Sequence, residues 1–167
     1  AEDQTYLISF FDQLEGFIDL DFEFVDSSES ADIAIFYDSE VINIEHPGAT
    51  GLATSNQNGW ELFIDYSELY NDSPYRQYVL AHEIGHALGL EHPFDDYDND
   101  VYMGITNPWS SAYPDQTVMA YRRPLDGSWP NFFTESDLLA LIDIWGAATA
   151  EESGISESSD YVVGTSL

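Results

Sequence analysis

The chain contains no cysteine and no lysine, and three arginines and four histidines are its only basic side chains. Without thiols it can form neither disulfides nor thiolate metal sites, so a bound metal would need histidine, carboxylate or carbonyl ligands. The 32 acidic residues give a formal net charge of −29, which makes nucleic acid and anionic membrane surfaces unsuitable partners. The acidic excess fits either a simply solvated surface or an adaptation to salt or calcium.

Long apolar runs are also missing. No stretch of about 18 apolar residues occurs, so no membrane-spanning helix is expected. The first residue is alanine and no signal peptide is visible, as expected if a targeting segment has been removed. With 167 residues, of which 44% are hydrophobic and 15% aromatic, the sequence predicts one folded domain with its own core, most simply a monomer.

The apolar spacing predicts a mixed α+β fold. Residues 7–18 carry apolar side chains at helical spacing, which predicts an opening amphipathic helix. Apolar or alternating runs predict strands at 22–24, 33–37, 41–44, 51–54 and 60–64.

Two further helices have clear start and stop signals. The segment 71–74, Asn-Asp-Ser-Pro, predicts a helix over 74–88 that ends near Gly89. Thr134 and Asp137 form a capping-box pattern at the start of a helix that Gly146 closes. The segment 91–117 between them lacks periodicity, which is typical of a functional or ion-stabilised loop.

The segment 82–92 reads His-Glu-Ile-Gly-His-Ala-Leu-Gly-Leu-Glu-His. His82 and His86 are four residues apart, so both imidazoles leave one face of a helix. Gly89 can adopt the left-handed conformation that ends the helix and returns the chain, which brings His92 to the same point. Three neutral imidazoles are the ligands of a catalytic zinc with an open position, and Glu83 would face the water there. Three of the four histidines occupy these positions, which argues against ordinary core or surface histidines.

The features after this motif resemble the metzincin zinc endopeptidases, most closely the serralysin-like (family M10) bacterial secreted proteases. Met119 lies 27 residues after His92, where the family has its methionine turn. Pro93 directly after the third histidine and Tyr121 two residues after the methionine match the same pattern. The likeness extends over residues 22–146, but the glycine-repeat calcium domain of the family is not evident after Gly146.

The resemblance implies a metzincin catalytic domain over residues 1–150. Residues 1–89 would form an N-terminal subdomain with a twisted mixed sheet and the long active-site helix. Residues 90–150 would form a smaller irregular subdomain with the methionine turn and one final helix, and the active-site cleft would lie between the two. The acidic Ser/Glu-rich residues 151–167 are expected to be a tail or linker.

The function implied is that of a secreted, extracellular, bacterial zinc metalloendopeptidase. Glu83 would activate the zinc-bound water. By resemblance, Tyr121 is a fifth zinc ligand that swings away to donate to the developing oxyanion; the alternative is a structural tyrosine. The substrate would bind as an extended strand beside Gly51, Leu52, Ala53 and Thr54, or these residues form an ordinary strand or loop. Arg122 would line a substrate pocket, or be solvated or paired with a carboxylate.

Asp95, Asp96, Asp98 and Asp100 form an oxygen-rich group after the zinc motif. The spacing fails the EF-hand pattern, so the alternatives are a different calcium site or a solvated acidic loop. A catalytically silent zinc module that binds peptides remains a second functional class, although it would have no use for Glu83. A self-cleaving or cargo-specific processing protease is a further alternative within the enzyme class.

Overall fold

The computed structural model describes residues 2–38, 48–69, 71–97, 99–149 and 161–166. The strands are β1 (Phe22–Val25), β2 (Ile33–Asp38), β3 (Gly51–Asn56), β4 (Gly59–Asp65) and β5 (Tyr161–Ser166). The helices are α1 (Glu2–Leu14), α2 (Tyr66–Leu69), α3 (Ser73–Ala87) and α4 (Glu135–Trp145), with 3-10 turns η1 (Ser28–Ser30) and η2 (Tyr102–Gly104). This composition confirms the mixed α+β class.

The five strands form one mixed sheet in the order β1-β5-β2-β4-β3. Four strands are parallel, and β3 runs antiparallel to β4 at the edge. The tight turn between β3 and β4 is the predicted polar one: Asn56 pairs with Gly59, and the side chain of Asn56 accepts from the backbone N–H of Asn58 at 2.7 Å. Gly59 is required there, because a Cβ would lie 2.3 Å from the carbonyl oxygen of Asp32.

The C-terminal end differs from the expectation. Residues 151–167 were expected to be a tail or linker, but Tyr161–Ser166 form β5, which lies between β1 and β2 in the sheet. The expectation is wrong for these six residues, whose run Tyr-Val-Val-Gly-Thr-Ser is rich in strand-forming side chains and is stabilised as a parallel strand by distant partners. The strand predicted at 41–44 and His46 lie outside the described residues.

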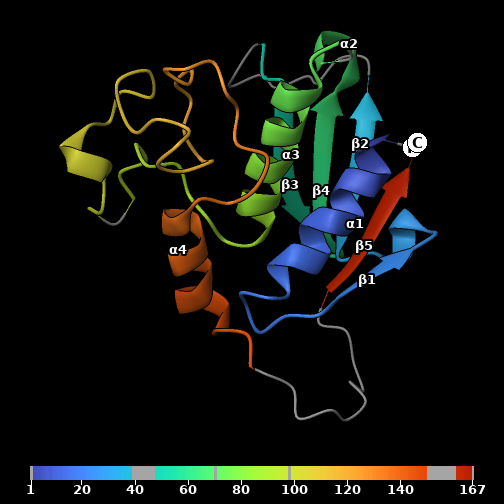
Figure 1. Cartoon of the computed structure of the whole chain (residues 1–167). Helices are drawn as coiled ribbons and strands as arrows, with labels where there is room; N and C mark the ends of the chain where they lie inside the picture. Colours follow the sequence, from blue (N-terminus) through green and yellow to red (C-terminus); the bar gives the residue numbers. More distant parts are fainter. Residues whose placement is uncertain (1, 39–47, 70, 98, 150–160, 167) are drawn as a thin grey trace.

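Helices α1 and α3 cover one face of the sheet (Figure 1). On α1, the core-facing side chains Leu7, Phe10, Phe11 and Leu14 are buried, as the helical spacing predicts. The two helices are also joined by polar contacts. The buried Arg76 of α3 donates through Nε to both carboxylate oxygens of Asp3 at 3.0 Å. This ion pair fixes the first turns of α3 and so supports the functional residues further along that helix.

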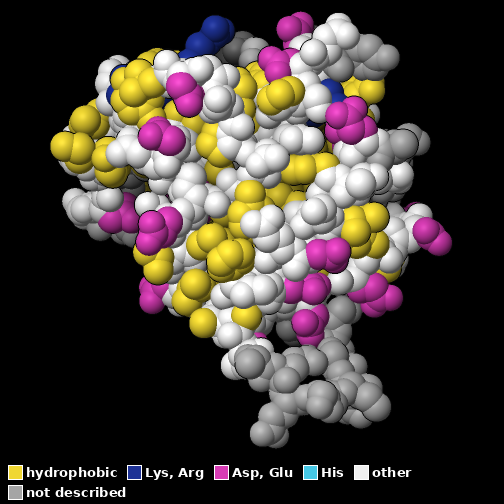
Figure 2. Space-filling view, in the orientation of Figure 1, with side chains coloured by type: hydrophobic (Ala, Val, Ile, Leu, Met, Phe, Trp, Pro, Cys, Tyr) yellow, Lys and Arg dark blue, Asp and Glu magenta, His cyan; other side chains and the backbone are white. Residues whose placement is uncertain are grey.

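Most of the chain between α3 and α4 is irregular, as expected for this segment, and lies beside α3 opposite the sheet (Figure 1). Acidic side chains are scattered over the visible surface rather than gathered in one patch (Figure 2). None of the described helices is both long enough and apolar enough to cross a membrane.

Candidate metal centre

Helix α3 carries two of the three candidate ligands, and its ends follow from local sequence. Asp72 caps the N-terminus by accepting from the backbone N–H of Tyr75 at 3.2 Å. At the C-terminus Gly89 has φ +100°, and Leu90 N–H donates back to the carbonyl oxygen of Gly85 at 2.9 Å. This reversal is the left-handed helix end predicted at Gly89, and it returns the chain towards the helix.

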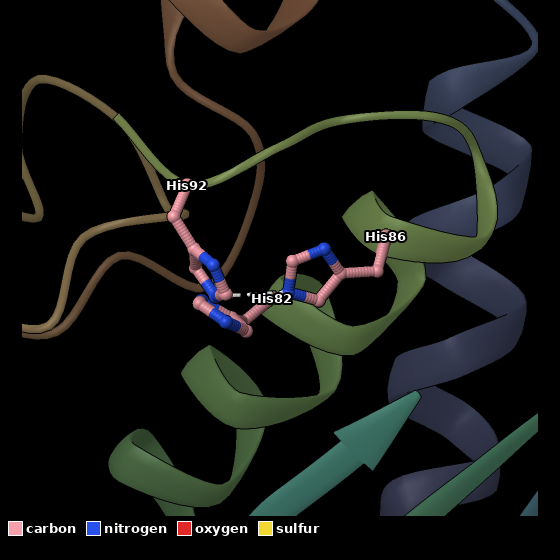
Figure 3. A group of neighbouring side chains, drawn as sticks. All are labelled: His82, His86 and His92. Atoms are coloured by element: carbon pink, nitrogen blue, oxygen red, sulfur yellow. Dashed lines mark hydrogen bonds between the residues drawn. The ribbon is translucent and has the colours of Figure 1, made fainter. Parts of the chain in front are cut away.

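The three histidines of the motif meet at one point (Figure 3). His82 and His86 project from successive turns of α3, and His92 approaches from the segment after the reversal. One ring nitrogen of each lies within 4.8 Å of the others, and they form the only such group of three or more histidine, cysteine or acidic side chains in the described part of the chain. The group could hold a metal ion.

The hydrogen bonds of the three rings fix their tautomers. His82 Nδ1 lies 2.8 Å from the carbonyl oxygen of Val118, and His86 Nδ1 lies 2.9 Å from that of Leu90. Carbonyl oxygens only accept, so both Nδ1 atoms carry the proton. His92 Nδ1 likewise faces Asp95 Oδ2 at 2.9 Å. Each ring is therefore held through Nδ1, which leaves its Nε2 facing the common point as a possible ligand atom.

The remaining nitrogens fit a cation better than they fit one another. The Nε2 atoms of His86 and His92 are 3.1 Å apart, yet neither has a proton to donate if Nδ1 carries it. Two facing lone pairs repel, whereas a tetrahedral zinc with Zn–N bonds of about 2.0–2.1 Å would hold two such nitrogens about 3.3 Å apart. Burial lowers the pKa of His82 well below its usual value, with the neighbouring imidazoles adding to the effect, and burial also lowers the pKa of His86. Both rings are thus neutral, as metal ligands must be.

Glu83 lies beside the histidines and is buried, with 5% of its surface exposed. Burial raises the pKa of its carboxyl group to about 8, while a hydrogen bond from the backbone N–H of Ala53 acts in the opposite direction. Gly51 at the start of β3 provides the space for this side chain, because a Cβ there would lie 2.3 Å from Glu83 Oε1. A buried carboxylate with raised proton affinity is suited to accept a proton from a neighbouring group.

Met119 lies against α3, the helix that carries His82 and His86. It is buried, and its sulfur would be 2.6 Å from a Cβ added at Gly85. The glycine between the two ligands of α3 therefore lets the methionine approach the helix backbone. The sequence pattern predicts a structural role for Gly89 and Met119 but not for Gly85, for which the position between the two helical histidines is the available signal.

The segment before Met119 is held by Asp137 of α4. The carboxylate of Asp137 accepts from Val118 N–H at 2.9 Å, from the Thr117 hydroxyl at 2.5 Å and from Thr134 N–H at 2.8 Å. The predicted capping box at Thr134 is present. Because the carbonyl oxygen of Val118 contacts His82, Asp137 links the cap of α4 to the first ligand, a role that the sequence analysis did not assign.

Tyr121 lies at the edge of the histidine group. Its ring centroid is 4.8 Å from that of His92 and 5.7 Å from that of His82. Burial raises the pKa of its hydroxyl to about 12, with Glu83 and Asp95 adding to the effect. The hydroxyl is therefore a proton donor near the three ligands.

Pro93 stands between the last ligand and Phe94, whose ring stacks on that of His92 at 4.7 Å.

A cavity of about 380 Å³ opens beside His82 and Glu83. Of the candidate substrate-binding residues, Gly51 lines this cavity, while Leu52, Ala53 and Thr54 continue along the edge strand β3. Arg122 is not among the lining residues. Its guanidinium group donates to the carbonyl oxygen of Ser111 at 3.1 Å and lies over the ring of Tyr113 at 3.4 Å. Within the described residues Arg122 forms no ion pair with a carboxylate, and its contacts hold the segment that carries residues 110–113.

Of the four aspartates proposed for calcium, Asp95, Asp96 and Asp100 lie within the described ranges. Asp95 instead contacts His92, and Asp95, Asp96 and Asp100 join no metal-binding group within the described ranges. Asp98 lies outside those ranges. The structure thus assigns Asp95 to the histidine site, as the acceptor that orients its third ring.

Comparison of the sequence with models of protein families and with curated proteins finds no match.

Proposed function

We propose that the chain is a zinc metalloendopeptidase of the metzincin type. The observation that carries the proposal is the meeting of three imidazole Nε2 atoms, each set by an acceptor on Nδ1, beside the buried carboxylate of Glu83. His82, His86 and His92 would hold the zinc, which three neutral imidazoles suit. Met119 against α3 and the reversal at Gly89 add further features of the metzincin pattern.

When bound, zinc would polarise the scissile carbonyl group and make water more acidic. Glu83 faces the cavity and would take the proton of the attacking water on its carboxylate oxygen. The same carboxyl group would then protonate the leaving nitrogen. The Ala53 N–H and the space at Gly51 hold this carboxylate in place.

Tyr121 would also take part in the reaction. Its ring contacts His92 and Trp109 and lines the same cavity as Glu83. From there its hydroxyl could donate a hydrogen bond to the oxygen of the scissile carbonyl as negative charge develops on it. A substrate would lie as an extended strand along the edge of β3 that pairs with no other described strand, and the first residue of β3 lines the cavity.

The test is cleavage of fluorescently labelled casein by the native protein and by Glu83→Gln, with zinc content measured in both. The proposal predicts that the native protein cleaves casein and that Glu83→Gln retains zinc but loses at least about 100-fold of the rate. A native protein that binds zinc without cleaving casein would favour the silent peptide-binding module instead. A Glu83→Gln variant as active as the native protein would refute the role of this carboxylate.

A further inference from the structure

The cavity beside Glu83 has one wall made of aromatic rings. Tyr75 and Tyr78 come from the first half of α3, and Trp129 comes from the irregular segment before α4. The sequence analysis assigned no role to these three residues. The volume of about 380 Å³ lies within the range of about 300–1,000 Å³ that is usual for ligand pockets.

The ring of Trp129 packs against the rings of both tyrosines. The centroid of Trp129 is 4.5 Å from that of Tyr75 and 4.7 Å from that of Tyr78. Separations of this size are those of rings in contact. The rings therefore form a continuous wall, rather than the open cage that would surround a cationic group on several sides.

The hydroxyl groups of the two tyrosines in the wall are already engaged. The Tyr78 hydroxyl donates to the carbonyl oxygen of Ala120 at 2.5 Å, and the Tyr75 hydroxyl shares a hydrogen bond with Thr50 Oγ1 at 3.3 Å. Val79 and Ala120 add apolar surface, and the small residues 48–51 also line the cavity. A polar side chain entering this space would lose water without gaining partners.

The ionisable residues that line the cavity also favour an apolar side chain there. Glu83 and His82 are the lining groups other than tyrosines that can ionise. The proposed function uses both of them at the reaction centre. No arginine or lysine is among the residues that line the cavity, so an acidic side chain entering it would lose water without gaining a cationic partner.

We propose that this cavity, which we call the aromatic pocket, selects substrates with a bulky apolar side chain, preferably aromatic, at a residue adjoining the cleaved bond. The inference rests on the proposed function, because the pocket adjoins Glu83 and His82. Trp129 is the main specificity-determining residue, since it is half-buried and contacts both tyrosines.

The test is digestion of a peptide mixture of varied sequence by the native enzyme, followed by identification of the cleaved bonds. The proposal predicts that phenylalanine, tyrosine, tryptophan or leucine is enriched about tenfold or more over alanine at one position next to the cut. Aspartate and glutamate should be depleted at that position. Cleavage without side-chain preference at either adjoining position would overturn the inference and leave the proposed function standing.

Substitutions of Trp129 test whether this residue causes the preference for aromatic side chains. Trp129→Ala should reduce the enrichment of aromatic residues to threefold or less, whereas Trp129→Phe should keep most of it. Leu139→Ala, on the exposed face of α4 at 61% exposure, is the matched control and should leave the cleavage pattern unchanged. An unchanged pattern in folded Trp129→Ala would refute the role of this residue.

A binding measurement separates the two proposals. Peptides that differ only by phenylalanine or aspartate at one position are titrated against Glu83→Gln, and binding is followed by fluorescence anisotropy of a dye at the end of the peptide. The pocket predicts at least about tenfold tighter binding of the phenylalanine peptide, even if the native protein proves unable to cleave. Equal binding of the two peptides would contradict the pocket, and absent cleavage with selective binding would contradict only the peptidase.

Discussion

The start of β3 leaves no room for a side chain opposite Glu83, and Gly51→Ala tests this directly. The backbone at Gly51 does not have positive φ, so alanine introduces no backbone strain there. Its Cβ would nevertheless lie 2.3 Å from Glu83 Oε1 and 2.7 Å from Val79 Cγ1. Valine is stiff at χ1, whereas the glutamate side chain can rotate, so we expect the carboxylate to move.

The distance that the Glu83 carboxylate must move determines the expected loss of activity. Ordinary contact with a Cβ begins at 3.4 Å, so the carboxylate oxygen must shift by about 1 Å, a misplacement that can cost about 100-fold in rate. This corresponds to about 2.7 kcal/mol of transition-state stabilisation. Zinc should be retained, because the three atoms nearest to an added Cβ belong to Glu83 and Val79 and not to a histidine.

The assay is kcat/KM for a fluorogenic peptide, with zinc content and circular dichroism measured on the same samples. Ser55→Ala is the matched control, since Ser55 is exposed and lies on the same side of β3 four residues further along. The control should retain native activity. A Gly51→Ala variant that is folded, holds zinc and stays within threefold of the native kcat/KM would refute the argument that this space positions Glu83.

Three further substitutions test the residues that hold the candidate zinc ligands in place. Gly85→Ala would put a Cβ 2.6 Å from the sulfur of Met119, so chemical denaturation should show a loss of about 1–3 kcal/mol, where glycine to alanine inside a helix normally stabilises. Asp95→Ala removes the acceptor at 2.9 Å from His92 Nδ1, so competition with a chelating dye should show zinc affinity about 10–100-fold weaker, and Asp95→Asn should lose less. Asp137→Ala leaves buried donors without an acceptor, so the free energy of unfolding should fall by about 3 kcal/mol; a change below about 0.5 kcal/mol would contradict its linking role.

Local signals in the sequence were enough to predict the helices that build the site. The capping residues Asp72 and Thr134 and the terminal glycines Gly89 and Gly146 set the bounds of α3 and α4 within one or two residues. Each of these signals acts through hydrogen bonds or backbone conformation within a few residues. The meeting of the three histidines followed from the same local geometry.

Features that depend on distant partners could not be predicted in this way. Strand β5 requires β1 and β2 on either side, about 130 residues earlier in the chain. Asp95 was grouped with neighbouring aspartates by composition, although its nearest functional partner is His92. In the aromatic pocket Trp129 contacts residues of α3. The local sequence of neither segment predicts this contact.

Zinc titration of the metal-free protein tests the central claim most directly. Zinc is removed with a chelator, the chelator is dialysed away, and casein cleavage is followed as zinc is returned in known amounts. The account predicts no cleavage without metal, a linear rise in rate, and saturation at about one zinc per chain, as expected for a single three-histidine site. Cleavage by the metal-free protein, or one bound zinc with no cleavage of casein or the peptide mixture, would contradict it.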